Sequence, residues 1–370
     1  MTGQLIDLDA VVRAGGADAA LDGGDQDCGS GLLLSLTSAM RRLEPGQVLA
    51  VGTRERSVLV DLPAWAGLAG HDLLEVVDGT EKGGGGRSEW LLRIRRGGLA
   101  PSAQFTTGNA VPLGERLWLQ TNFHCNLACT YCCAQSSPKA SARMMPPELA
   151  RVAVEEFVAG GGRELLLTGG EPFLHPGLGQ IVAHAAKLVP VTILTNAMVF
   201  DRGARRAMLQ EMDRDRVALQ VSLDSATPDL HDRIRGAGSH ARAIQGIRLA
   251  SGLGFRVRVA ATLGPDDVTQ VHALHALLDD LGIAADDRLV RPVAQEGAAE
   301  LGVHISLETI EPELTLTVDG AWWHPVGITN PHLKISNEPV PIAPILAVIK
   351  DVLAVQAAGT AQGRNVFRCT

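Results

Sequence analysis

Residues 117–133 read LWLQTNFHCNLACTYCC. The apolar run at 117–121 is followed closely by three cysteines with the spacing Cys125-x3-Cys129-x2-Cys132. A short apolar run bounded by polar residues predicts a buried strand, and thiolates are the soft ligands that iron–sulfur clusters and zinc use. The stretch therefore predicts a strand that ends in a metal-binding loop.

The spacing of the cysteines allows more than one kind of site. Three thiolates on a tight loop can hold three irons of a cubane and leave the fourth iron open to a substrate. A structural zinc site with Cys133 or His124 as fourth ligand fits the same loop, and so do redox-active or accidental thiols. Four of the six cysteines fall within residues 125–133, which is unlike the disulfide framework of a secreted domain.

Apolar runs and amphipathic segments alternate on both sides of this loop. Strand followed by helix, repeated, predicts parallel βαβ units. Six such strands predict an α/β fold, a partial (β/α)6 TIM-like barrel with its chemistry at the carboxyl ends of the strands. The predicted strands are residues 117–121, 164–168, 191–195, 216–222, 255–263 and 288–294, and the predicted helices are residues 147–159, 176–188, 202–212, 241–253 and 268–281.

Three further elements follow the cysteines in order. GGEP comes after the second predicted strand at 169–172, SLD ends the fourth at 222–224, and HDRIRG follows at 231–236. Together with Tyr131 before the last cysteine of the motif, they resemble the elements of radical S-adenosylmethionine (radical SAM) enzymes over residues 118–294. A zinc fold does not explain these elements, so a cluster is favoured.

The resemblance implies a [4Fe–4S] cluster on Cys125, Cys129 and Cys132, with SAM on the open iron. One electron, from a reductase or flavodoxin-type donor, would split SAM and give a 5′-deoxyadenosyl radical that abstracts hydrogen from a substrate. In this resemblance, the glycine pair would lie close to the methionine amino group of SAM, and the Ser-x-Asp element would bind the ribose. The tyrosine would pack near the adenine, and one of two arginines would pair with the SAM carboxylate. The residues so placed at SAM are Tyr131, Gly169, Gly170, Glu171, Pro172, Ser222, Asp224, Arg233 and Arg235.

Residues 1–95 have the pattern of a separate two-layer βαβαββ domain. Helices are predicted at 32–43 and 58–69, and a cysteine, Cys28, precedes the first, where a helix dipole lowers a thiol pKa. LDGGDQDC at 21–28 and the segments after it resemble the TusA/SirA-like sulfur carriers, which implies a persulfide on a catalytic Cys28. Gly29-Ser30-Gly31 stands where that family has Pro-x-Pro, which favours instead a docking or substrate-recognition role for the domain.

Two more segments complete the chain. Residues 96–115, rich in Gly, Pro, Ser and Thr, are predicted to be a linker. Residues 295–370 are predicted to form a cap with a hairpin at 314–323 and a helix at 342–355. The VDG turn at 318–320 is similar to the SPASM extensions of peptide-modifying radical SAM enzymes. Because Cys369 is the only cysteine there, no auxiliary cluster is expected.

The bulk composition narrows the protein class. The 370 residues carry a net charge of −8 and are 46% hydrophobic, which is typical of a globular protein and gives no basic footprint for nucleic acid. No run of 18 apolar residues predicts a membrane span, and the N-terminus lacks the basic region of a secretory signal. A cytoplasmic location is therefore expected.

Three functions remain open from the sequence. Modification of a peptide or protein is favoured by the SPASM-like extension. Sulfur insertion or cofactor biosynthesis on a small-molecule substrate, with a sulfur-transfer partner, is favoured by Cys28. A non-catalytic iron–sulfur redox sensor or scaffold is the third, although such a protein has no need of the elements that hold SAM.

Overall fold

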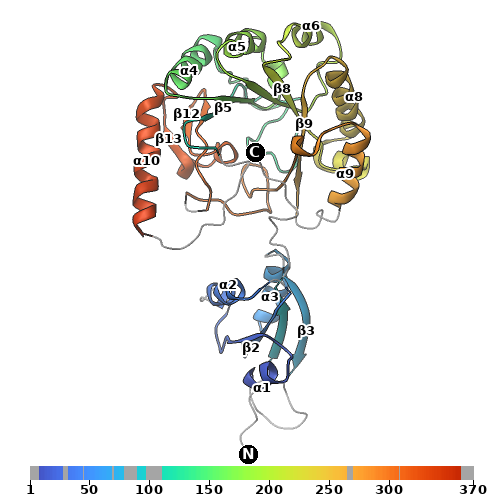
Figure 1. Cartoon of the computed structure of the whole chain (residues 1–370), viewed down its shortest axis with the longest axis vertical. Coiled ribbons are helices and arrows are strands. Elements are labelled where there is room, and N and C mark those ends of the chain that lie inside the picture. The colour runs from blue at the N-terminus through green and yellow to red at the C-terminus, as the bar shows by residue number, and fades with distance from the viewer. Residues whose placement is uncertain are drawn as a thin grey trace, which may run out of the picture. The chain divides into compact units, whose positions relative to one another are not determined.

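A computed structural model describes most of the chain (Figure 1). The described residues are 8–27, 32–44, 46–68, 71–78, 90–96, 111–264, 270–307 and 309–359. The chain divides into two compact units, Met1–Gln104 and Phe105–Thr370. Cys28, Cys369 and most of the predicted linker lie outside the described residues.

The N-terminal unit is a four-stranded sheet with helices on both faces. Its elements are α1 (Leu8–Arg13), β1 (Ala19–Asp22), α2 (Leu33–Arg42), β2 (Val48–Thr53), α3 (Val58–Leu68), β3 (Asp72–Asp78) and β4 (Trp90–Arg95). The strand order is β1-β2-β4-β3, with β1 and β2 parallel and β4 antiparallel to its neighbours. The predicted βαβαββ order is present from β1 onward, whereas α1 was not predicted.

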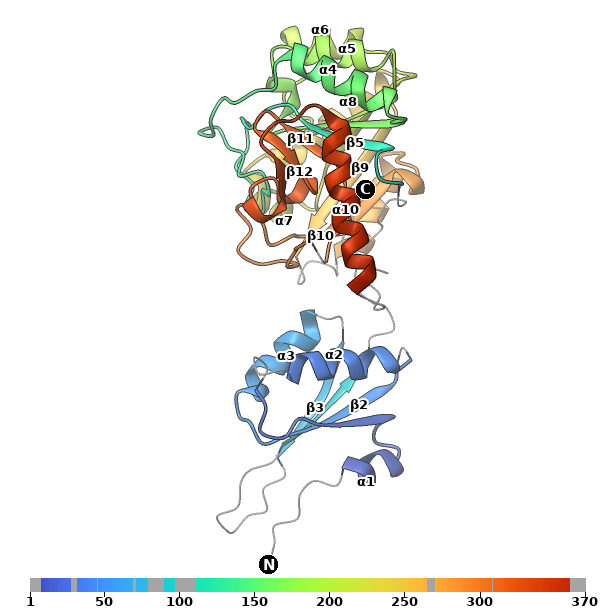
Figure 2. The same ribbon diagram turned by 90° about the vertical axis from the view of Figure 1, so that its left-hand side faces the viewer.

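The two faces of this sheet are covered differently (Figure 2). Leu36 of α2 and Leu62 of α3 are fully buried against Val51 and Leu92 of the sheet. On the opposite face Val11 of α1 packs with Ala50 and Leu91 in a smaller cluster. The unit therefore has its own core.

The C-terminal unit contains the predicted barrel. Six parallel strands lie in the order β10-β9-β8-β7-β6-β5. The strands are β5 (Arg116–Gln120), β6 (Glu164–Thr168), β7 (Val191–Thr195), β8 (Val217–Ser222), β9 (Val257–Leu263) and β10 (Arg288–Pro292). All six match predicted strands within two residues, so the partial TIM-like barrel is confirmed.

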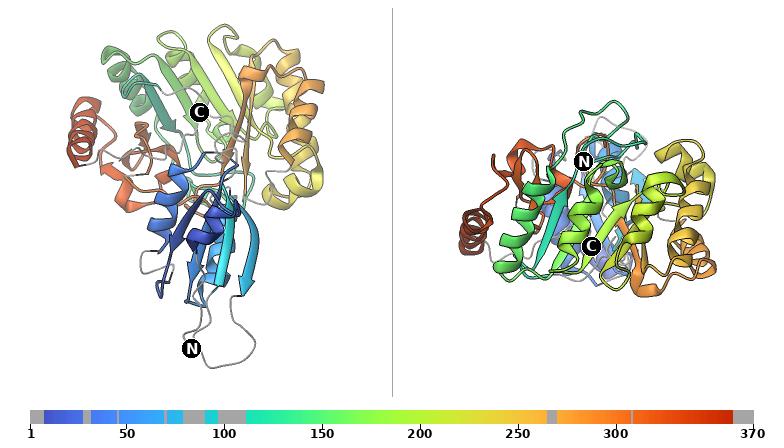
Figure 3. Two further views of the ribbon diagram at one scale, coloured as in Figure 1. Left: turned by 60° about the horizontal axis from the view of Figure 1, so that its bottom comes forward. Right: turned by 90° about the horizontal axis from the view of Figure 1, so that it is seen from above.

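Helices cover the outer face of this curved sheet (Figure 1, Figure 3). They are α4 (Pro147–Ala159), α5 (Leu178–Ala185), α6 (Gly203–Glu211), α8 (Ser239–Gly252) and α9 (Val271–Asp280), whereas α7 (Pro228–Arg235) contacts the cysteine loop through a hydrogen bond from Thr130 to Ile234 (3.0 Å). Their apolar faces join the strands in one core, which includes Phe157, Ile181, Leu209 and Ile247. α7 was not predicted, because its eight residues are mostly charged or polar.

The C-terminal extension continues the barrel sheet. The strands β11 (Thr315–Thr317), β12 (Gly320–Trp322) and β13 (Lys334–Ser336) extend it beyond β5, to which β11 is parallel. The predicted hairpin forms between β11 and β12, and the final helix is α10 (Ile342–Gly359). The backbone of Ile342 donates a hydrogen bond to Glu156 of α4 (2.7 Å), so the extension joins the barrel directly.

No helix in the described part of the chain combines the length and the apolar character that crossing a bilayer requires.

Candidate active site

The cysteine loop begins where β5 ends, at the carboxyl edge of the sheet. Cys125, Cys129 and Cys132 are free thiols, and Cys125 is buried. The backbone N–H of Leu127 donates to Sγ of Cys125 (3.4 Å), and that of Ser136 donates to Sγ of Cys132 (3.3 Å). Such N–H···S bonds are one means by which proteins tune iron–sulfur clusters.

Burial raises the pKa of two thiols of the loop. Burial raises the pKa of Cys125 to about 12, and the charge of Glu171 raises it further. Burial also raises the pKa of Cys129, although the charge of Arg235 opposes this. A metal centre must displace these protons, because the thiolate is the ligand.

The donor set fits a cubane held by three cysteines. Such a cluster takes one thiolate on each of three irons, so its thiols need not converge on one point. Within the described residues, no three His, Cys, Asp or Glu side chains are grouped around the position of a single ion.

Gly169 and Gly170 are required by the approach of the cysteine loop. A Cβ on Gly170 would lie 2.2 Å from the carbonyl oxygen of His124, and one on Gly169 would lie 2.3 Å from the side-chain oxygen of Asn122. The N–H of Gly170 also donates to the carbonyl of Asn122 (2.8 Å). The structure therefore gives a reason for these glycines within the chain itself, while their predicted approach to SAM stays a prediction.

Glu171 joins the cysteine loop to the ends of β6 and β7. Its fully buried carboxylate accepts hydrogen bonds from the hydroxyl of Thr195 (2.8 Å) and the backbone of Asn196 (2.9 Å) and Phe173 (3.1 Å). Burial raises its pKa to about 7, although these hydrogen bonds oppose the shift. Protein groups surround Glu171, so it holds the turn that Pro172 continues into a short 3-10 helix.

Asparagine side chains complete the connection. Asn122 donates to the carbonyls of His124 (2.8 Å) and Glu171 (3.1 Å). Asn196, just after β7, donates to the side chain of Asn126 (2.9 Å) and lies 3.9 Å from Sγ of Cys125. Asn122 and Asn126 had no predicted role, because their only signal in the sequence is their position on either side of the first cysteine of the motif, Cys125.

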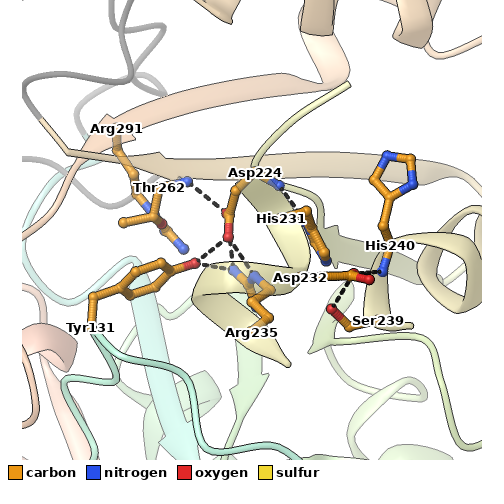
Figure 4. A network of polar contacts seen from close by, with 9 residues as sticks. All are labelled: Tyr131, Asp224, His231, Asp232, Arg235, Ser239, His240, Thr262 and Arg291. Carbon is orange, nitrogen blue, oxygen red and sulfur yellow. Dashed lines mark hydrogen bonds and ion pairs between the residues drawn. The ribbon is translucent and has the colours of Figure 1, made fainter. Parts of the chain in front are cut away.

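A buried polar network joins the cysteine loop to the end of β8 (Figure 4). Asp224, which is fully buried, pairs with Nε of Arg235 (2.6 Å). It also accepts hydrogen bonds from the hydroxyl of Tyr131 (2.8 Å) and the backbone of Thr262 (3.0 Å), and Arg235 donates to Tyr131. Burial alone would raise the pKa of Asp224, but the charge of Arg235 and its hydrogen bond lower it. The aspartate is therefore held ionised.

This network gives protein partners to three of the predicted SAM residues. Both carboxylate oxygens of Asp224 have protein partners, and Tyr131 and Arg235 both contact that carboxylate. Their contacts to SAM stay a prediction. Their arrangement suits positioning of the cysteine loop, because Tyr131 belongs to that loop.

The remaining predicted residues are placed more simply. Ser222 is half-buried at the end of β8, while Arg233 is exposed on α7. Asp232 of the same helix accepts hydrogen bonds from the backbone of Gly238 (2.7 Å) and His240 (2.8 Å). The segment HDRIRG (231–236) thus supplies Arg235 as the partner of Asp224. It also supplies Asp232, whose hydrogen bonds hold the start of α8.

His231 makes the fold sensitive to acid. Its Nδ1 accepts a hydrogen bond from the backbone of Asp224 (3.1 Å), and burial lowers its pKa to about 4, although the charge of Asp224 opposes this. The unfolded chain takes up this proton below about pH 6.5 and the folded chain does not, so stability should fall by about 1.4 kcal/mol per pH unit between about 6.5 and 4. Urea unfolding at pH 7 and pH 5 measures the loss. It should be about 2 kcal/mol smaller in His231→Gln, and an equal loss in both proteins would contradict this assignment.

The C-terminal region covers the end of the cysteine loop. The backbone of Ala298 donates to the carbonyl of Cys132 (3.0 Å), and the hydroxyl of Thr329 donates to that of Cys133 (2.9 Å). Trp322, which is 8% exposed, packs in a cluster that includes Phe123 and Cys132. The extension therefore contacts the cysteine loop directly.

Comparisons with known proteins agree with this geometry. Residues 120–279 match the model of the radical SAM superfamily. One relative is the antilisterial bacteriocin subtilosin biosynthesis protein AlbA of Bacillus subtilis. It is 29% identical over 203 residues, which are 52% of this chain and 43% of AlbA. The AdoMet-dependent heme synthase of Oleidesulfovibrio alaskensis is 25% identical over 219 residues, 58% of this chain and 54% of the synthase.

The chain spans about half the length of these curated relatives. Among solved structures, native anSMEcpe with bound AdoMet has a similar fold, with a TM-score of 0.51 and 11% identity over 65% of this chain and 83% of anSMEcpe. Residues 120–279 therefore form a radical SAM domain, the domain of enzymes that use a [4Fe–4S] cluster and S-adenosylmethionine.

Proposed function

We propose that this chain is an enzyme that reductively cleaves SAM at a [4Fe–4S] cluster bound by Cys125, Cys129 and Cys132. The observation that carries the proposal is that the radical SAM match begins at residue 120 and includes all three free thiols. The position of the loop at the carboxyl ends of parallel strands supports it further.

When bound, such a cluster supplies one electron to the SAM sulfonium and so starts radical chemistry. The residues of the chain hold and shield the site. Backbone N–H groups donate to Cys125 and Cys132, and the burial of Cys125 keeps water from it. Ser222, half-buried at the end of β8, remains our candidate for a hydroxyl contact to the SAM ribose.

For the substrate, we propose a ribosomally made peptide. The relationship to AlbA, a bacteriocin biosynthesis protein, supports this class. A small molecule is the second candidate, because the heme synthase is also a relative. An external one-electron donor of the reductase or flavodoxin type is part of either proposal.

The direct test is release of 5′-deoxyadenosine by the anaerobically reconstituted chain with SAM and dithionite. We expect release by the wild type and by Cys133→Ala, and none above background by Cys129→Ala. A wild-type protein with an intact cluster and no release would support the redox-sensor alternative. Precursor peptides from neighbouring genes, added one at a time, should raise the release, and a rise only with small molecules would favour the second candidate.

A further inference from the structure

A cavity lies at the opposite end of the barrel from the cysteine loop. Its volume is about 720 Å³, within the range of small-molecule sites. Arg116, Glu164, Val191, Val217 and Arg288 line it, and each is the first residue of its strand. The cavity therefore opens at the amino ends of the strands, whereas every motif of the proposed SAM site lies at the carboxyl ends.

The lining is rich in positive charge. Six of the lining residues are arginines and three are carboxylates. Three of the arginines are paired with carboxylates: Arg116 with Glu164 (2.7 Å), Arg256 with Asp287 (2.7 Å) and Arg288 with Asp279 (2.6 Å). The other three lining arginines have only two lining carboxylates, Asp215 and Asp286, among them. This small excess of guanidinium groups favours an anion in the cavity.

Arg258 is the lining arginine that the protein satisfies least. It lies on β9, its side chain is 15% exposed, and its buried Nε has no hydrogen-bond partner among the described residues. The carboxylate paired with it, Asp287, is 3.9 Å away and is already bound by Arg256. Burial lowers the pKa of Arg258. A buried guanidinium with so little compensation costs stability, which suggests that a ligand supplies the missing acceptor.

Gln220 provides a second unsatisfied group on the same side of the sheet. It pairs with Arg258 in the parallel register of β8 and β9, so the two side chains share a face. Gln220 is 1% exposed, and neither its amide nitrogen nor its oxygen has a partner in the described part of the chain. Two residues earlier on the same face, the small side chain of Ala218 lines the cavity, which leaves space toward the amide.

We propose that this cavity binds a small anionic molecule through a phosphate or carboxylate group, with Arg258 as the main contact and Gln220 as a neutral hydrogen-bonding contact beside it. Guanidinium forks suit both anions, and an amide can both donate and accept. The site is separate from the SAM site and does not depend on the proposed reaction.

Titration calorimetry on the reconstituted full chain, with pyrophosphate and citrate as probes, tests the proposal. At least one probe should bind saturably at about 0.15 M salt, where purely surface attraction is screened. Tighter binding of pyrophosphate would identify a phosphate ligand, and tighter binding of citrate a carboxylate. Arg258→Met should weaken binding at least about 30-fold, while Arg248→Met, on the exposed face of α8, should leave it unchanged.

Thermal unfolding without a probe separates a binding role from a structural one. If Arg258 is kept for a ligand, Arg258→Met should melt at or above the wild-type midpoint, because a poorly compensated buried charge is removed. A midpoint several degrees lower would assign Arg258 to the fold. The proposal also fails if neither probe binds the wild type, or if Arg258→Met binds as the wild type does.

Discussion

Gly170→Ala should reduce SAM cleavage by at least about 100-fold. The new Cβ would lie 2.2 Å from the carbonyl oxygen of His124 and 2.9 Å from that of Phe123, both backbone atoms that cannot rotate away. The loop that carries Cys125 must shift, and misplacement of reacting groups by about 1 Å can cost about 100-fold in rate. Overpacking of this kind also lowers stability by about 1–3 kcal/mol. The rate of 5′-deoxyadenosine release and the urea midpoint measure the two effects.

Gly252→Ala is the matched control. Gly252 ends α8, and a Cβ there would meet nothing within 4 Å. Activity should equal that of the wild type, and stability should be unchanged or slightly higher, because alanine favours the helix. If Gly170→Ala behaves like Gly252→Ala, the close approach of the GGEP turn to the cysteine loop is wrong.

Asp224→Asn should destabilise the barrel by about 3–5 kcal/mol, because it leaves the buried Arg235 without its counter-charge. Asparagine has only one acceptor oxygen, whereas Asp224 uses two to accept from Tyr131, Arg235 and Thr262. The cysteine loop should therefore loosen and load less cluster. Urea unfolding gives the stability loss, and iron content after reconstitution gives the loading.

Two variants show whether the ion pair is the cause. Glu148→Gln makes the same chemical change in an exposed pair of the same unit, with Arg151 of α4, and should leave stability close to that of the wild type. Asp224→Asn combined with Arg235→Met removes both charges and should recover part of the loss. Equal losses in Asp224→Asn and Glu148→Gln would show that the network does not hold the site.

The barrel strands could be predicted from sequence because their signals are local. Each strand is a short apolar run before a turn, and the helices between them repeat their apolar residues at helical spacing. The pairing of β11 with β5 could not be predicted, because it joins residues almost 200 positions apart. α1 and α7 were missed because six and eight residues carry too little periodicity.

At the site, too, the sequence predicted which motifs matter but not which groups their side chains contact. GGEP and SLD were recognised as functional elements, but their contacts were assigned to SAM. The structure shows that Gly170, Glu171 and Asp224 also have protein partners, whereas their contacts to SAM stay a prediction. A motif records which residues are needed but not what they touch. The cavity around Arg258 had no sequence signal, because its arginines come from separate strands and loops.

We propose above all that three thiols hold a cubane with one iron open to SAM. The most direct test is electron paramagnetic resonance of the anaerobically reconstituted chain, reduced with dithionite and recorded with and without SAM. We expect about four irons per chain, a reduced-cluster signal that SAM shifts, and loss of that signal in Cys125→Ala. Zinc in place of iron, or a cluster signal that SAM leaves unchanged, would contradict the account.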